Sequence, residues 1–138
     1  MIQHAVLSVH LTFPGTCADA FRFYERLLGG STLTLLRYAD SPAATTVPAE
    51  FRDKLIHATL IVGHDQLAGA DIEPSQYQRP AGFYLLFSAP TRADAERIFA
   101  GLADGGDVKM AMQSTFWSPA FGVVVDRFGT PWEITVAG

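Results

Sequence analysis

The sequence has little of several features that mark special classes of protein. Its single cysteine among 138 residues excludes a disulfide within the chain and predicts a cytoplasmic protein. No apolar run approaches the roughly 18 residues that a membrane-spanning helix needs, and we expect no signal peptide. Charged residues make up only 17% of the chain and give a net charge of -4 without a basic cluster. We therefore expect neither a membrane nor a nucleic-acid partner.

Hydrophobic residues, by contrast, are plentiful. They make up 49% of the chain, which argues for a packed globule rather than a disordered segment. A length of 138 residues also suits one domain with a sizeable core. We therefore predict a single domain that covers residues 1–138.

The first half of the chain has the pattern of a strand, a helix and three further strands. Residues 5–13 alternate, so Leu7, Val9 and Leu11 should pack against the helix that follows. Thr16 with Asp19 resembles a capping box at the start of that helix. The helix is expected to reach Leu28 and end at Gly29-Gly30. The later strands are expected over residues 31–38, 54–62 and 66–70, with a proline-containing loop over 39–51.

The second half repeats this order. A strand is expected over residues 82–88, then a helix capped by Thr91 with Asp94, ending at Gly105-Gly106. Residues 107–113 predict a strand in which Val108, Met110 and Met112 alternate onto one face. The final hairpin is expected to pair residues 121–125 with 132–136 around a turn at Gly129.

The recurrence indicates a duplication. The same 76 positions separate Phe23 from Phe99 and Gly29 from Gly105. Helix caps, glycine pairs and closing strands recur in the same order. The predicted fold class is therefore α+β, with two tandem βαβββ modules forming a cupped mixed sheet with helices on the outer face. The predicted modules cover about residues 1–70 and 82–138, with a linker over 71–81.

One helix can cover only one face of a four-stranded sheet, so the second face of each sheet is not covered by the helix of its own module. Strand alternation predicts that the polar residues opposite the helices face a cleft between the modules. The predicted cleft residues are Ser8, His10, Thr12, His57, Thr59, Glu133 and Thr135. Imidazoles, hydroxyls and a carboxylate amid aromatic residues are typical of a pocket for a small molecule.

Several motifs resemble one known family. They are F-x-G-x-C-x-x-A-x-x-F-Y over residues 13–24, HATL over 57–60, GGDVKM over 105–110, TFW over 115–117, FG over 121–122, DRFG over 126–129, and Trp132. This set resembles the PhnB-like branch of the vicinal oxygen chelate superfamily, which includes glyoxalases, bleomycin-resistance proteins and extradiol dioxygenases. The resemblance implies paired βαβββ modules, a small-molecule ligand and a homodimer. Some proteins of this branch are labelled methyltransferases, but the chain has no Gly-rich strand-to-helix turn of the dinucleotide-binding type.

The resemblance also implies candidate metal ligands. Metal-using members of the superfamily hold a divalent ion with four ligands, typically His and Glu. Glu133 falls directly at one such position, and His10 falls near another after a small gap. The remaining two positions fall near Ala68-Gly69 and Tyr84-Leu85, which offer no good ligand. Because stable transition-metal sites usually need three or more protein ligands, the pattern favours a site without metal.

Three functions remain open from the sequence. The first is binding of a small, partly apolar molecule without an assigned reaction. The second is a metal-dependent lyase, isomerase or dioxygenase in which Glu133 and His10 chelate the ion and His57 assists, although His57 is more simply a hydrogen-bonded strand residue. The third is a drug-sequestering protein without catalysis. Phe116 and Trp117 are placed either at the pocket mouth or at the dimer interface, and Cys17 is expected to be structural.

Overall fold

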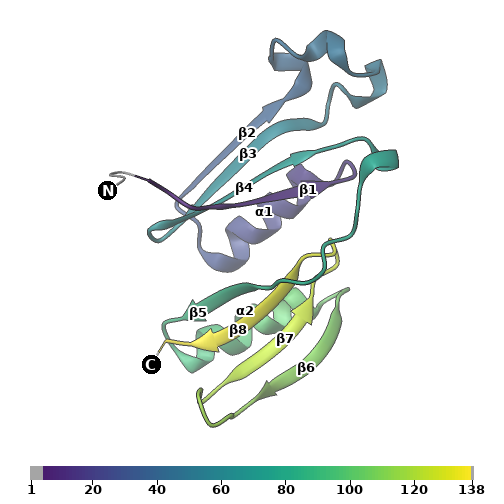
Figure 1. The fold of residues 1–138 in the computed structure, drawn as a ribbon. Coiled ribbons are helices and arrows are strands. Elements are labelled where there is room, and N and C mark those ends of the chain that lie inside the picture. The colour runs from purple at the N-terminus through teal and green to yellow at the C-terminus, as the bar shows by residue number, and fades with distance from the viewer. Residues whose placement is uncertain (1–4, 138) are drawn as a thin grey trace. The chain divides into compact units, whose positions relative to one another are not determined.

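The computed structural model describes residues 5–137 and divides into two compact units, Met1–Tyr77 and Gln78–Gly138. Each unit contains a four-stranded sheet and one α-helix. In each, the helix lies along one face of its own sheet (Figure 1). The predicted α+β fold with two tandem modules is confirmed. Within residues 5–137, no helix is long and apolar enough to cross a membrane.

The first unit follows the order β1 (Val9–Phe13), α1 (Cys17–Leu28), β2 (Thr32–Arg37), β3 (Leu55–Val62) and β4 (Asp65–Asp71). Its sheet has the strand order β1-β4-β3-β2, with β1 parallel to β4 and the other pairs antiparallel. Asp71, the first residue of the predicted linker, is therefore the last residue of a strand. The sheet is mixed because β1 runs parallel to β4, while β3 is antiparallel to both β4 and β2.

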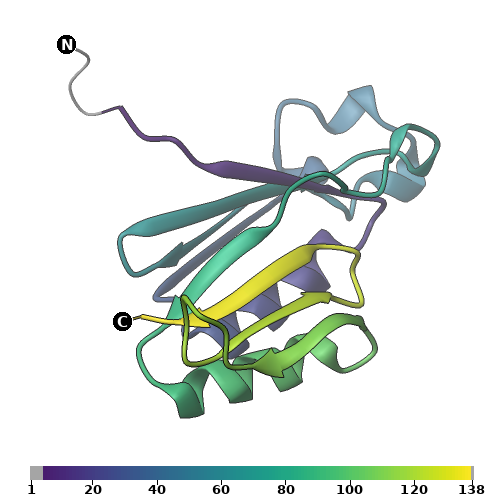
Figure 2. The ribbon, with the colours of Figure 1, turned by 60° about the horizontal axis from the view of Figure 1, so that its bottom comes forward.

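The second unit follows the order β5 (Leu85–Ala89), α2 (Arg92–Ala103), β6 (Asp107–Gln113), β7 (Phe121–Val125) and β8 (Pro131–Val136). Its strand order β5-β8-β7-β6 repeats that of the first unit position by position, and its first and last strands are again parallel. In Figure 2 the strands β6, β7 and β8 lie next to one another, with the green helix α2 along the bottom. The shared topology confirms the duplication that the spacing of helices and glycines predicts.

Close contact between helix and sheet depends on one glycine in each unit. A Cβ on Gly69 of β4 would lie 2.7 Å from the ring of Phe21, and one on Gly122 of β7 would lie 2.6 Å from the ring of Phe99. Both phenylalanines belong to the helices and are buried. A strand glycine therefore lets each helix approach its sheet closely.

The first strand is shorter than its alternation predicts. Leu11 and Phe13 are buried, but Leu7 is fully exposed and Val9 is 37% exposed. The expected packing of Leu7 against the first helix is therefore wrong. The reason is that β1 pairs with β4 only from Val9 onwards, opposite Leu67, so the residues before it extend beyond the sheet.

The two helices begin in different ways. The Thr91 hydroxyl accepts a hydrogen bond from the Asp94 amide at 3.1 Å, as the capping box predicts. The same hydroxyl also donates to the Asp94 carboxylate at 2.9 Å. Thr16 makes no such bond, so the predicted cap of α1 is wrong. Instead, the Asp71 carboxylate accepts from the amides of Gly15 and Cys17 at 3.0 and 2.9 Å. A buried acid from a distant strand thus takes over the role of a local cap.

This difference gives a matched pair of substitutions. Thr91→Ala is expected to lower the free energy of unfolding by about 1 kcal/mol, because the Asp94 amide loses its acceptor. Thr16→Ala is expected to change it by less than about 0.5 kcal/mol. Urea unfolding of both variants checks this, and equal losses for the two would contradict the assignment of caps.

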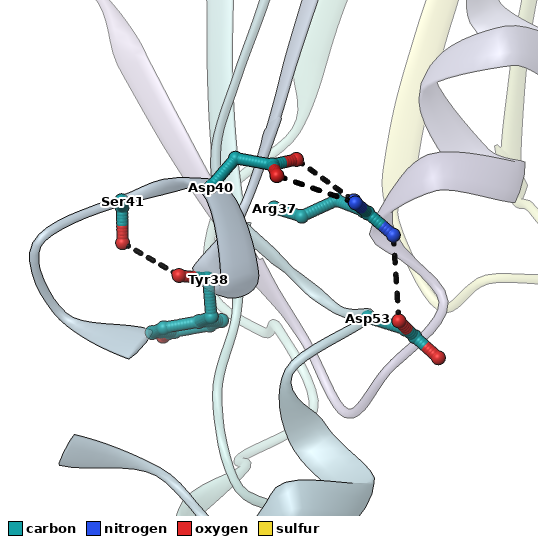
Figure 3. A network of polar contacts seen from close by, with 5 residues as sticks. All are labelled: Arg37, Tyr38, Asp40, Ser41 and Asp53. Carbon is teal, nitrogen blue, oxygen red and sulfur yellow. Dashed lines mark hydrogen bonds and ion pairs between the residues drawn. The ribbon is translucent and has the colours of Figure 1, made fainter. Parts of the chain in front are cut away.

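The loop predicted over residues 39–51 is built from three short 3₁₀ turns, Tyr38–Asp40 (η1), Ala44–Thr46 (η2) and Ala49–Phe51 (η3). The Arg37 guanidinium contacts both carboxylate oxygens of Asp40 at 2.9 and 3.3 Å and reaches Asp53 at 3.4 Å (Figure 3). The hydrogen bond from Arg37 lowers the pKa of Asp40. Because Asp53 lies past the end of the loop, these ion pairs join its two ends.

Candidate functional site

The sheet face opposite α1 carries three of the predicted site residues. His10 pairs with Ala68, Ala68 with Thr59, and Thr59 with Thr34. Paired residues in neighbouring strands point to the same side, so His10 and Thr59 share a face. His57 lies two positions from Thr59 on β3 and is on that face too. We call this the His10 face; it contains His10, Thr12, Thr34, Leu36, His57, Thr59 and Ala68.

The two imidazoles of the His10 face do not contact each other. They lie on β1 and β3, which are two strands apart and therefore about 10 Å apart across the sheet. Neither His10 nor His57 makes a side-chain hydrogen bond with any residue in 5–137, and both are exposed. The expectation that His57 is hydrogen-bonded to a neighbouring strand is therefore not met. Both rings are free to contact a ligand.

The face opposite α2 has a different character. Leu86, Glu133, Val123 and Met110 form one row across all four strands. Phe121 and Thr135 pair in the next row on the same side. We call this the Glu133 face, made of Leu86, Met110, Phe121, Val123, Glu133 and Thr135. Leu86 is 62% exposed and Met110 is 37% exposed, so the half-buried carboxylate of Glu133 stands in an otherwise apolar row.

A β-bulge in β6 brings Met110 onto the Glu133 face. Val108 pairs with Val124 but Met110 pairs with Val123, and the register shifts between them. Since Val123 and Val124 are adjacent, they point to opposite sides of the sheet. The predicted alternation of Val108, Met110 and Met112 onto one face is therefore wrong for Met110.

An aromatic segment extends the Glu133 face. The rings of Phe116 and Trp117 lie 4.7 Å apart between centroids, and Trp117 lies 5.3 Å from Phe121, both edge-to-face. Phe116 is 97% exposed and Trp117 is 57% exposed. We call Phe116 and Trp117 the aromatic arm. Its contact with Phe121 continues the apolar surface that surrounds Glu133.

The base of the aromatic arm is held by a buried serine. The Ser118 hydroxyl contacts the Thr135 hydroxyl at 2.6 Å and donates to the carbonyl of Ala120 at 2.7 Å. The Thr115 hydroxyl accepts from the Ser118 amide at 3.1 Å. These bonds fix the arm to β8, two residues from Glu133. Ser118 was not among the predicted site residues, because nothing in the sequence pattern links it to Thr135.

The potential metal-ligating side chains of each unit do not fit a transition-metal site. Glu133 is neighboured in its row by Leu86, Val123 and Met110, and His10 by Ala68 and Thr59. None of the side chains next to Glu133 is an imidazole or carboxylate. Over residues 5–137, neither unit gathers three His, Cys, Asp or Glu side chains that could hold an ion. Stable transition-metal sites usually have at least three such ligands.

Cys17 lies at the start of α1, where a helix dipole would favour a thiolate. Its side chain is fully buried, however, and burial, reinforced by the nearby Asp71 charge, raises the pKa of the thiol. We expect native protein at pH 8 to react with a thiol reagent such as Ellman's reagent at least about tenfold more slowly than unfolded protein in urea. Equal rates in the two states would contradict a structural role.

Two βαβββ units, each with its helix on one face of a four-stranded mixed sheet, define a recognisable class of fold. Residues 2–134 match the Glyoxalase/Bleomycin resistance protein/Dioxygenase superfamily. The chain belongs to this superfamily, as the motifs predict.

Individual relatives agree over almost the whole chain. Protein YjdN of Escherichia coli (strain K12) is 35% identical over 138 residues, which covers 94% of each chain. The crystal structure of protein PA1353 from Pseudomonas aeruginosa is 38% identical, with a TM-score of 0.85 over 96% of this chain and 98% of that one. A Bacillus cereus structure described as a putative 3-demethylubiquinone-9 3-methyltransferase, PhnB protein, is 22% identical, with a TM-score of 0.75 over 96% and 100%. At that identity, the last likeness concerns the fold alone.

Proposed function

We propose that this chain binds a small, partly apolar molecule at the open faces of its two sheets, as a single PhnB-like domain that assembles as a homodimer. The binding does not depend on a metal ion. The observation that carries this proposal is the Glu133 face. One carboxylate stands there in a row with Leu86, Val123 and Met110, and the aromatic arm continues the surface.

The composition of the Glu133 face supports a ligand rather than a purely structural role. A few polar groups placed within an apolar and aromatic surface are typical of sites that fix a small molecule in one orientation. Exposed large apolar side chains that lie together also mark binding surfaces more often than scattered ones do. On the His10 face, His10, His57 and Thr59 supply hydrogen-bonding groups. Each face therefore offers a guest contacts of its own kind: hydrogen bonds on the His10 face, and apolar and aromatic contacts on the Glu133 face.

Trp117 provides the test of this proposal. A screen of aromatic and aliphatic small molecules by thermal shift supplies ligands, and calorimetry then compares wild type with Trp117→Ala and Trp117→Phe. We expect Trp117→Ala to weaken binding about tenfold, because a stacked aromatic contact and its buried area are lost. Trp117→Phe keeps an aromatic ring and serves as the matched control, with nearly unchanged affinity. Unchanged affinity in both variants would contradict a site at the Glu133 face.

The metal content of the purified protein distinguishes this proposal from the metal-dependent alternative. Metal analysis of protein purified without chelator is expected to give far less than one ion per chain. A stoichiometric ion that is lost in Glu133→Ala would instead favour a lyase, isomerase or dioxygenase in which Glu133 and His10 hold it. Sedimentation analysis tests the homodimer, and a monomer at all concentrations would contradict it.

A further inference from the structure

We propose that the Glu133 face selects organic cations: molecules with a protonated or quaternary nitrogen attached to an apolar or aromatic body. This inference rests on the proposed function and adds the charge of the ligand to it. It follows from three features of the second unit. These are a carboxylate without a partner, the apolar row in which it stands, and the aromatic arm beside it.

Within the described part of the chain, the Glu133 carboxylate has no partner of its own. It makes no hydrogen bond or ion pair with any residue among 5–137, although it is half-buried between Leu86 and Val123 in the row across the sheet. Covering an unpaired carboxylate with an apolar guest would cost free energy, because the charge would lose its water. A guest that brings a positive charge to this point avoids the loss and gains a charge-assisted hydrogen bond.

Two basic side chains of the second unit, those of Lys109 and Arg127, form their contacts with residues other than Glu133. Asp107 pairs with Val125 and so lies on the same side of the sheet as Val123. Lys109, on the same strand, is already paired with Asp107 at 2.7 Å. At the turn between β7 and β8, Arg127 lies 3.9 Å from Asp104 and 5.3 Å from the Phe128 ring centre. The carboxylate is therefore left for a ligand.

The surroundings of Glu133 suit the rest of such a molecule. Leu86 and Met110 offer exposed apolar surface on either side of the row. The ring of Trp117, held edge-to-face against Phe121, presents an indole, the aromatic group that attracts cations most strongly. The bonds of Ser118 fix the base of this arm, so the stacking surface is ordered before a ligand arrives.

Other occupants fit the Glu133 face less well. A metal ion would find one carboxylate and no second ligand in its row. An anionic ligand would approach a carboxylate in a chain of net charge -4, which is repulsive. A second copy of the chain docked face to face would bring two unpaired Glu133 carboxylates towards each other. A molecule with a single positive charge on an apolar body fits the carboxylate, the apolar row and the aromatic arm together.

The test uses three probes of the same shape and different charge: 1-naphthylmethylammonium, 1-naphthylmethanol and 1-naphthoate. Binding of each to the full chain is measured by calorimetry at low salt. We expect the cation to bind about tenfold or more tightly than the alcohol, which is the effect of one charge-assisted hydrogen bond. The anion is expected to bind most weakly. Glu133→Gln should remove the preference for the cation, because the cation and the alcohol then both meet a neutral amide.

Matched variants make the outcomes distinct. Glu96→Gln removes an exposed carboxylate of α2, which is paired with Arg92, and is expected to keep the full preference for the cation. Binding of all three probes with equal affinity, weakened by Trp117→Ala but not by Glu133→Gln, would overturn this inference and leave the proposed function standing. No binding of any probe, or of any compound in the thermal-shift screen, would overturn both. Binding of Zn²⁺ or Mn²⁺ alone that requires Glu133, or dissociation of a dimer in Glu133→Gln, would also overturn the inference.

Discussion

Asp71→Ala is expected to lower the free energy of unfolding by about 3–5 kcal/mol. The Asp71 side chain is 1% exposed, and its two oxygens accept hydrogen bonds from the amides of Gly15, Cys17 and Leu55 at 2.9 to 3.0 Å. Alanine leaves these amides without an acceptor at the start of α1 and of β3. The helix also loses a negative charge at its N-terminus, where the dipole favours one. Urea unfolding followed by circular dichroism measures the loss.

Two further variants make this result specific. Asp71→Asn keeps the shape and one good acceptor, so it is expected to lose less than Asp71→Ala. Asp65→Ala removes the exposed acid at the opposite end of the same strand and is expected to change stability by less than about 0.5 kcal/mol. A loss below about 1 kcal/mol for Asp71→Ala would mean that water or rearranged backbone replaces the carboxylate, contrary to this account.

Asp126→Ala is expected to destabilise the second unit by about 3 kcal/mol. One Asp126 oxygen accepts from the amides of Phe128 and Thr130 at 2.8 and 3.1 Å, and the other accepts from the Trp132 indole at 2.9 Å. The side chain is 2% exposed. Alanine therefore removes the acceptor that closes the turn between β7 and β8, together with the acceptor of the buried Trp132 indole N–H. The effect reaches the candidate site because this hairpin carries Glu133.

Thermal unfolding and tryptophan emission measure this effect together. The matched control is Asp104→Ala, which removes an exposed carboxylate at the end of α2, 3.9 Å from Arg127. We expect a clear fall in melting temperature for Asp126→Ala and a change within about 1 °C for the control, since exposed ion pairs contribute little. Equal shifts in the two variants would contradict a special role for the buried acid.

Local patterns in the sequence predict the fold well where both partners are close along the chain. The Thr91 cap and its Asp94 partner lie three residues apart, and the turn at Gly129 is set by a φ of 92° that glycine adopts readily. The cap of α1 could not be predicted in this way. Its acceptor, Asp71, lies 56 and 54 residues from Gly15 and Cys17, so only the folded sheet brings them together.

The candidate site, too, could be predicted only in part: local patterns place single side chains, but not their neighbours on other strands. Period-two alternation places the side chains of His10 and Glu133 opposite the helices without any knowledge of pairing. Alternation fails for the neighbours of Glu133, because residues 121–125 are apolar on both sides of the strand and a bulge moves Met110 to the Glu133 face. The row in which Glu133 stands depends on strand register, which the sequence pattern does not specify. That row is what distinguishes an apolar site with one charge from a metal site.

We propose that a small molecule binds at the Glu133 face beside Trp117, and the two tryptophans allow a direct measurement of this binding. The chain has two tryptophans, and the indole of Trp132 is buried against Asp126 while that of Trp117 is 57% exposed. Nitrogen-15 NMR spectra therefore contain one indole signal at the site and one internal control. On titration with 1-naphthylmethylammonium or 1-naphthylmethanol, the Trp117 indole signal and the backbone amide of Glu133 should shift, while the Trp132 indole signal stays in place. Shifts confined to α2, or no saturable shift at Trp117 with either probe, would contradict the account.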